Sequence, residues 1–138
     1  MNRNDILTAA AQVFSQKGFH AASMQDIAQA VNLQKASLYH HIDSKQEILL
    51  ALLDQAFDLL TEHIQPVISQ PNPIADKLQL AMCAYLTDML ENRELALVLL
   101  LEYRSLRNEY RARHILRRDR FEQLWRDMIR EGIDAGVF

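Results

Sequence analysis

The stretch VNLQKASLYHHIDSKQEIL is rich in polar and aromatic side chains of the kinds that contact nucleic acid. Lys35 can donate hydrogen bonds to guanine O6 and N7 or to a phosphate, and Ser37 can bond a base edge or a phosphate. Tyr39 and His40 can donate to phosphates and contact thymine methyl groups. The stretch therefore indicates a short helix that presents its polar side to a ligand.

Two neighbouring side chains fit the same surface. Gln25 lies near the start of the preceding helix and can bond the N6 and N7 atoms of adenine. Lys45 lies in the first turn of the following helix, where it can hold a phosphate together with that helix's amide N-terminus. His41 follows His40 directly, so the two rings point about 100° apart and cannot share a metal ion. We interpret His41 as a structural residue.

Residues suited to covalent or metal chemistry are scattered along the chain. The sequence has no Ser/His/Asp or Cys/His constellation, no glycine-rich phosphate loop and no metal-ligand spacing. Cys83 is the only cysteine, which excludes an internal disulfide and fits a buried apolar side chain better than a redox sensor. We therefore predict no enzymatic activity, catalytic residue, metal or cofactor. The five histidines are His20, His40, His41, His63 and His114.

The elements that position the polar stretch are helices. Two short helices over residues 24–30 and 34–41, joined by a turn at Asn32, form a helix-turn-helix, whose second helix enters the DNA major groove. Asn32 can adopt the left-handed conformation that this turn needs. Elsewhere apolar residues recur at helical spacings of three and four, and no alternating strand pattern occurs, so the fold class is all-α. Five further helices are expected, over residues 4–17, 44–65, 74–91, 94–106 and 108–135.

Capping residues and breakers mark the ends of these helices. Asn, Asp and Ser side chains accept from the free N–H groups of a first turn, Gly adopts positive φ after a last turn, and Pro cannot continue a helix. The expected caps and breakers are Asn4, Gly18, Ser23 with Asp26, Asp43 or Ser44, Pro66 and Gly136.

Two of the expected helices are rich in apolar residues. The helix over residues 94–106 is nearly all apolar and should be buried on most sides. On the inner side of the helix over residues 74–91 we expect Leu78, Met82, Tyr85, Leu86 and Met89.

Charge is distributed unevenly over the 138 residues. The net charge of −3 divides into 0 over residues 1–50, −6 over residues 51–102, +5 over residues 103–130, where nine arginines accompany four acids, and −2 over residues 131–138. Such a basic block forms a nucleic-acid patch, a solvated helix face or an anion pocket. No run approaches the roughly 18 uncharged apolar residues of a membrane span, and the N-terminus lacks a signal-peptide pattern. We expect a cytoplasmic protein without a membrane partner.

Residues 6–53 resemble the N-terminal domain of TetR-type transcriptional regulators. The resemblance is carried by the AA-x-x-x-F helix with Gly18 after it, the helix start SMQDIA, the segment SLYHHI and the SK pair of HIDSKQE. The chain departs from the family at Asn32 (usually Gly), Gln34 (usually Ser or Thr) and Ile42 (usually Phe). The DNA contacts that the resemblance implies are Gln25, Lys35, Ala36, Ser37, Tyr39, His40 and Lys45.

The same resemblance implies two domains: a helix-turn-helix DNA-binding domain over residues 1–47 and a ligand-binding and dimerisation domain over residues 48–138. The family continues for two more helices that form most of the dimer interface, so a chain ending at Phe138 looks truncated. The implied function is a repressor that binds a pseudo-palindromic operator as a homodimer and is released by a small molecule. The alternative is a helical protein-interaction module without operator binding, which the neutral charge of residues 1–50 would suit.

The last expected helix places arginine beside aromatic residues. At about 100° per residue, Arg118 shares a face with Phe121 and Trp125, and Arg111 lies close by. A buried arginine needs a partner, which is either a nearby glutamate or an anionic ligand. The stretch RRDRFEQLWRDMIREGIDAGVF is similar to regulators of fatty-acid or sterol breakdown, which implies an acyl-coenzyme A effector. The expected pocket comprises Tyr85, Met89, Leu99, Tyr103, Arg111, Arg118, Phe121 and Trp125.

Overall fold

The computed structural model describes all residues, 1–138, and contains helices without any strand, as the sequence predicts. No helix is long and apolar enough to cross a membrane. Seven α-helices are joined by short links, with one 3₁₀ turn, η1, between the last two. The elements are α1 (Arg3–Lys17), α2 (Met24–Ala30), α3 (Lys35–Leu38), α4 (Lys45–Ser69), α5 (Ile74–Glu91), α6 (Arg93–Leu101), η1 (Tyr103–Ser105) and α7 (Asn108–Asp134).

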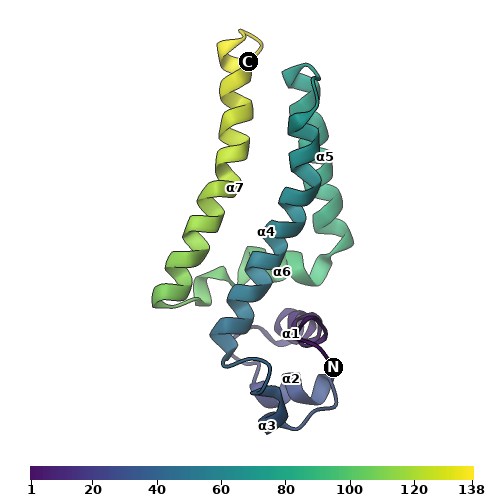
Figure 1. The fold of residues 1–138 in the computed structure, drawn as a ribbon, viewed down its shortest axis with the longest axis vertical. Coiled ribbons are helices and arrows are strands. Elements are labelled where there is room, and N and C mark those ends of the chain that lie inside the picture. The colour runs from purple at the N-terminus through teal and green to yellow at the C-terminus, as the bar shows by residue number, and fades with distance from the viewer.

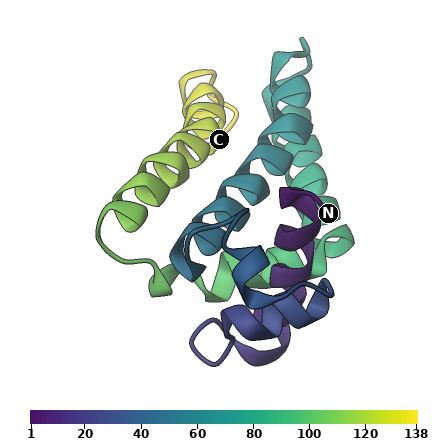
Figure 2. The same cartoon turned by 60° about the horizontal axis from the view of Figure 1, so that its bottom comes forward.

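The molecule is elongated, with the three N-terminal helices gathered at one end (Figure 1). Helix α4 starts in that end and runs along the molecule, and α5 returns antiparallel to it. Helix α6 crosses the waist of the molecule, and α7 then leads away from the N-terminal end along α4 (Figure 1). Turning that end forward shows α2 and α3 side by side at its tip (Figure 2). The fold therefore presents the polar stretch at one extremity.

Capping boxes define the starts of α1 and α2. The Asn2 side chain accepts from the N–H of Asp5 at 2.9 Å, and the Asp5 carboxylate accepts from the N–H of Asn2 at 3.1 Å. The predicted cap at Asn4 is wrong by two residues, since Asn4 lies inside the first turn. The predicted capping box of Ser23 and Asp26 is confirmed, with hydrogen bonds of 2.9 and 3.0 Å.

The turn before α3 has the geometry that its sequence predicts. Asn32 has a φ of 57°, in the left-handed region that asparagine tolerates. The helix that follows is shorter than predicted, because regular α geometry covers only Lys35–Leu38 and residues 39–41 form a turn. Gln34 stands at the N-cap without making a side-chain capping bond.

The two halves of the chain share one hydrophobic core. Its centre is built from α1, α2, α3 and the start of α4, and includes Phe14, Ile27 and Leu38. Val98 of α6 and Leu106, just after η1, are buried in the same cluster. The segment from α6 to Leu106 is therefore packed into the N-terminal end, and apolar contact joins the two halves in addition to the continuous α4.

A second, smaller core holds the body together further along α4. Leu60 and Ile64 of α4 pack with Ala81 of α5 and Met128 of α7. Three aromatic side chains, Tyr85, Phe121 and Trp125, lie against this cluster and are partly buried. The predicted inner positions Leu78, Tyr85 and Met89 of α5 are indeed partly buried, whereas Met82 and Leu86 are about half exposed, at 51% and 55%.

Three further expectations from the sequence are wrong. Helix α4 does not end at Pro66 but continues to Ser69. The missing Pro66 N–H would have bonded the carbonyl of the exposed Glu62, which water can satisfy, and Val67 and Ile68 pack on the second core and hold the last turn.

The predicted burial of the sixth helix and of Cys83 also fails. Only Ala96 and Val98 of α6 are buried, and Leu100 and Leu101 are 55% and 66% exposed because the crossing helix contacts its neighbours on one side. Cys83 is exposed on the outer side of α5.

Candidate DNA-binding surface and effector site

The outer side of α2 and α3 carries the side chains predicted to contact DNA. Gln25, Lys35, Tyr39 and His40 are exposed, and Ser37 is half-buried. The helix is held by Leu38, which is completely buried in the core, so its polar side must face away from the protein. None of these polar side chains is engaged in a hydrogen bond or ion pair within the chain, unlike the nearby Asp26, which pairs with Lys17 at 3.2 Å. The predicted contact Ala36 is also exposed.

Lys45 has a different environment from the other predicted contacts. Its Nζ donates to the carbonyl oxygens of Phe19 and Ala22 at 2.6 and 2.7 Å, and lies 4.4 Å from the centroid of the Phe19 ring. Burial, and then the charge of Arg107, lowers the pKa of Lys45 from its ordinary value of 10.5. An ammonium group has three donors, so one N–H remains for an outside acceptor. Lys45 thus fastens α4 to the α1–α2 loop.

The aromatic part of the predicted effector site does come together. The ring centroids of Tyr85, Phe121 and Trp125 lie 6.1 to 6.4 Å apart. Phe121 also packs at 5.4 Å against Phe57 of α4. These distances are typical of favourable aromatic pairs. The cluster forms an apolar wall between α4, α5 and α7.

The other predicted effector residues lie around this wall rather than in one cavity. Met89 lines a small gap between α4, α5 and α6, and Leu99 touches both cores. Tyr103 lies beside His114, with ring centroids 6.0 Å apart, and accepts a hydrogen bond from Arg104. That bond, with the charges of Arg104, Arg118 and Arg111, lowers the pKa of Tyr103.

The two arginines predicted for the effector site lie on the Tyr103 side of α7. Arg118 is in contact with Asp119 at 3.3 Å and Glu122 at 3.9 Å, which are acids of its own helix. Arg111 is exposed and makes no ion pair. Of the two partners considered for Arg118, the structure therefore contains a glutamate, supplied by the next turn.

Polar atoms without partners are buried between α4 and α7. His114 is 3% exposed, stacks on Phe57 at 5.6 Å, and its Nδ1 has no hydrogen-bond partner. Asp54 Oδ1 and Arg118 Nε are likewise buried and unbonded. Burial raises the pKa of Asp54 and lowers the pKa of His114, which favours the neutral form of both groups. The helical repeat indicated that Arg118 lies on this face of α7, but no pattern in the sequence indicated Asp54 of α4.

The junction between the two halves is fixed by one buried amide. Gln46 Nε2 donates to the carbonyl of Ser105 at 2.9 Å, and its Oε1 accepts from the N–H of Arg107 at 3.0 Å. The Ser105 hydroxyl also lies 3.3 Å from Nε2 of His20. The start of α4 and the α1–α2 loop thus bind the link between η1 and α7.

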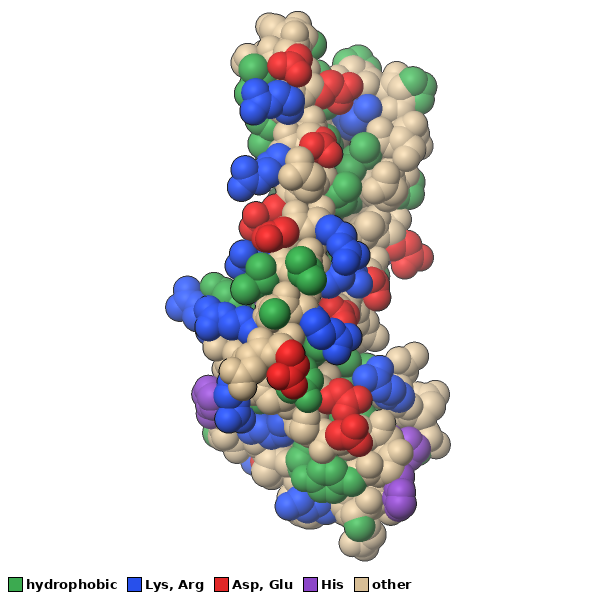
Figure 3. All heavy atoms as spheres, turned by 60° about the vertical axis from the view of Figure 1, so that its left-hand side comes forward, with side chains coloured by type: hydrophobic (Ala, Val, Ile, Leu, Met, Phe, Trp, Pro, Cys, Tyr) green, Lys and Arg blue, Asp and Glu red, His purple; other side chains and the backbone are tan.

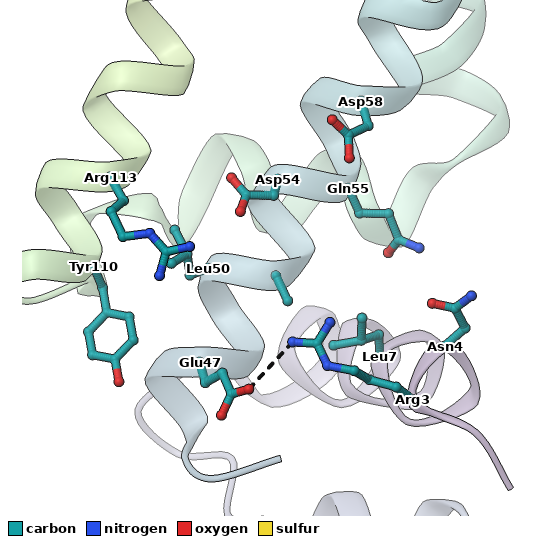
Figure 4. Close-up of a pocket in the computed structure, with 11 residues that line it drawn as sticks. Arg3, Asn4, Leu7, Glu47, Leu50, Asp54, Gln55, Asp58, Tyr110 and Arg113 are labelled. Atoms are coloured by element: carbon teal, nitrogen blue, oxygen red, sulfur yellow. Dashed lines mark hydrogen bonds and ion pairs between the residues drawn. The ribbon is translucent and has the colours of Figure 1, made fainter. Parts of the chain in front are cut away.

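A groove of about 490 Å³ opens between α1, α4 and α7. Figure 4 shows that Arg3 and Glu47 close one side of it through an ion pair of 3.5 Å, and that Arg113 reaches toward it from α7. Asp54 and Asp58 line the α4 side. The lining is mainly polar and charged, so this groove does not suit an acyl chain.

Two sequence families match the chain. Residues 6–52 match "Bacterial regulatory proteins, tetR family", and residues 71–138 match "Tetracyclin repressor-like, C-terminal domain". The HTH-type transcriptional repressor KstR2 of Mycobacterium tuberculosis is 29% identical over 139 residues, which cover 99% of this chain and 68% of KstR2.

Solved structures give the same result. The TetR family transcriptional regulator PfmR of Thermus thermophilus is 38% identical with a TM-score of 0.87, over 96% of this chain and 72% of PfmR. AibR, whose structure holds isovaleryl coenzyme A and operator DNA, is 27% identical with a TM-score of 0.89, over 100% of this chain and 75% of AibR. The chain is therefore shorter than each of these proteins.

Proposed function

The chain belongs to the TetR family of bacterial transcriptional regulators, which are DNA-binding proteins and not enzymes, and on that premise we propose that it is a repressor released from its operator by an acyl-coenzyme A. A homodimer would present two copies of α3 to successive major grooves of a pseudo-palindromic operator. Such a repressor acts in the cytoplasm, at the chromosome.

The observation that carries the DNA-binding part is the free polar surface on α2 and α3. A buried Leu38 and a left-handed Asn32 orient α3 so that its polar groups point outward without partners in the chain. In this arrangement Gln25 and Lys35 are suited to base edges, and Tyr39 and His40 to phosphates.

Selection from random duplex DNA by the full chain, at a verified oligomeric mass, tests this proposal. We expect recovery of a palindromic site. Tyr39→Ala should then weaken binding to all sequences, whereas Gln25→Ala and Lys35→Ala should each relax base preference and cost roughly 1–3 kcal/mol. If a verified dimer enriches no sequence, the protein-interaction module, which the neutral charge of residues 1–50 suits, replaces the repressor.

The effector part rests on the chemistry of the body. The wall of Tyr85, Phe121 and Trp125 offers apolar surface to an acyl chain, and α7 supplies arginines for phosphates. AibR, with a similar fold, was solved with isovaleryl coenzyme A. These features favour an acyl-coenzyme A over a neutral apolar effector, which would not use the arginines.

Fluorescence anisotropy of labelled operator DNA tests the effector. Isovaleryl and octanoyl coenzyme A should lower DNA affinity at least tenfold, while free coenzyme A and octanoate should do so weakly, because each carries only one of the two recognised parts. Phe121→Ala should blunt the response without weakening DNA binding in the absence of ligand. A lack of response to every acyl-coenzyme A would contradict this part of the proposal and leave the DNA-binding part intact.

A further inference from the structure

A groove on the outer side of α7 combines apolar and cationic lining. It has a volume of about 350 Å³ between α4 and α7 and adjoins a second hollow of about 270 Å³ with which it shares Arg117 and Arg120. We call the two together the α7 groove. Its lining comprises Asp54, Phe57, Thr61, Arg113, Leu116, Arg117, Arg120, Phe121 and Leu124.

The spacing of the arginines places them on one flank of α7. Arg113, Arg117 and Arg120 are separated by four and three residues and therefore form a single row. At about 100° per residue, this row lies on one flank of Phe121, and Arg111 and Arg118 lie on the other flank. Figure 3 shows the face that carries α7, with Lys and Arg side chains along it and apolar patches between them.

The charges in the α7 groove are only partly compensated. Arg113 and Arg120 make no ion pair within the chain, whereas Arg117 is bound to Asp58 at 2.5 Å. The Asp58 side chain is 68% exposed, so it can swing into water when a competing anion arrives. Burial raises the pKa of Asp54, the other acid nearby, while the charges of Arg117 and Arg113 act in the opposite direction.

The apolar part of the groove continues into the body. Phe57 is buried and packs on Phe121 at 5.4 Å, and Phe121 in turn contacts the rings of Tyr85 and Trp125. A ligand in the groove thus touches the aromatic wall through Phe121 while its charged end meets the arginine row.

We propose that the α7 groove binds the phosphorylated head of an amphipathic anion, with phosphate oxygens on Arg117, Arg120 and Arg113 and the adjoining apolar portion against Phe57 and Phe121. The proposal rests on the proposed function, because it locates the effector's head on the flank of α7 away from Arg111 and Arg118. Guanidinium groups bind phosphate through paired hydrogen bonds, and an incoming phosphate displaces Asp58 from Arg117. Binding therefore breaks the ion pair that links α7 to α4 through Asp58.

Isothermal titration of octanoyl coenzyme A into the full chain tests this assignment. The double variant Arg117→Ala with Arg120→Ala should bind at least tenfold more weakly, since two charge-assisted contacts are lost. Asp58→Asn should bind several-fold more tightly, because Arg117 is released from its internal partner. Arg126→Ala is the matched control on the same helix, since Arg126 is highly exposed and lies outside the groove, and its affinity should equal that of the wild type.

The outcomes separate the groove from the wider proposal. If only the double variant Arg111→Ala with Arg118→Ala loses affinity, while Arg117→Ala with Arg120→Ala binds fully, the α7 groove is not the binding site. The phosphorylated head then binds on the other flank of α7. Equal affinity in all variants also contradicts the groove proposal. If the ligand still releases the DNA in that case, the effector proposal remains. Binding that depends on Arg117 and Arg120 without DNA release supports the groove and refutes the effector role. Absence of binding to the wild type refutes both. The higher affinity expected for Asp58→Asn cannot result from misfolding, so it tests the groove even if Arg117→Ala with Arg120→Ala fails to fold.

Discussion

Replacement of Gln46 offers the sharpest test of how the two halves are joined. Its side chain is 8% exposed and makes two hydrogen bonds to backbone groups of the η1–α7 link, at 2.9 and 3.0 Å. Gln46→Met keeps the length and most of the volume of the side chain but can make neither bond. The carbonyl of Ser105 and the N–H of Arg107 would then be left without their partner.

The size of the effect follows from the cost of unsatisfied groups. A buried donor or acceptor without a partner costs about 1–3 kcal/mol, and partial access of water at the link reduces the sum for the pair. We expect Gln46→Met to lower the free energy of unfolding by about 2–4 kcal/mol, out of a total of about 5–15 kcal/mol for a protein domain. Gln46→Ala should lose slightly more, because it also leaves a cavity.

Urea unfolding followed by circular dichroism, at one protein concentration, measures this loss. Gln65→Met is the matched control, because Gln65 lies exposed on the same helix and its replacement should change stability by less than about 0.5 kcal/mol. If Gln46→Met unfolds at the same urea concentration and with the same slope as the wild type, the two hydrogen bonds do not hold the junction and our account of it is wrong.

Three further contacts in the chain can be tested by substitution. His63 Nδ1 lies 2.6 Å from the buried Asp88, and this bond raises the pKa of His63 above its ordinary value of 6.5. The pair should therefore stabilise the fold fully below about pH 6.5, and this stabilisation should be lost as pH rises through the raised pKa. Unfolding measured at a series of pH values should show this loss, and His63→Gln should abolish the pH dependence. Asn32→Val should cost about 1–2 kcal/mol in thermal unfolding, since a β-branched residue resists positive φ, whereas Asn32→Gly should be nearly neutral. Lys45→Met should lower the free energy of unfolding by about 1–3 kcal/mol, because the hydrogen bonds to two carbonyl groups are lost. If the third N–H of Lys45 also contacts a phosphate, the same substitution should reduce the slope of log K for DNA binding against log salt concentration by about one. An unchanged slope would mean that Lys45 has only a structural role.

Local rules predicted the DNA-binding end well. The capping box of Ser23 and Asp26, the left-handed Asn32 and the C-terminal Gly18 depend on backbone geometry within a few residues, and the sequence specifies that geometry directly. The structure adds that Leu38 is the one fully buried side chain of α3, which decides which side of this short helix faces outward.

Tertiary features were harder to predict. Pro66 continues α4 because packing of the last turn outweighs one missing hydrogen bond, a balance that no local rule contains. The exposure of Leu100 and Leu101 depends on how α6 crosses the molecule. Similarly, the helical repeat singled out Arg111 and Arg118 beside the aromatic residues of α7, but only the position of α4 shows that Arg117 and Arg120 border a groove.

The shared core has a consequence for protein engineering. The DNA-binding unit is discontinuous in sequence, because Val98 and Leu106 fill places in its core that residues 1–53 alone would leave empty, and vacating each such site costs about 2–5 kcal/mol. A chimaera that grafts the first 53 residues onto a foreign sensor should therefore fold poorly unless the new body supplies apolar side chains at equivalent places. A graft that also carries residues 93–107 would keep this core complete.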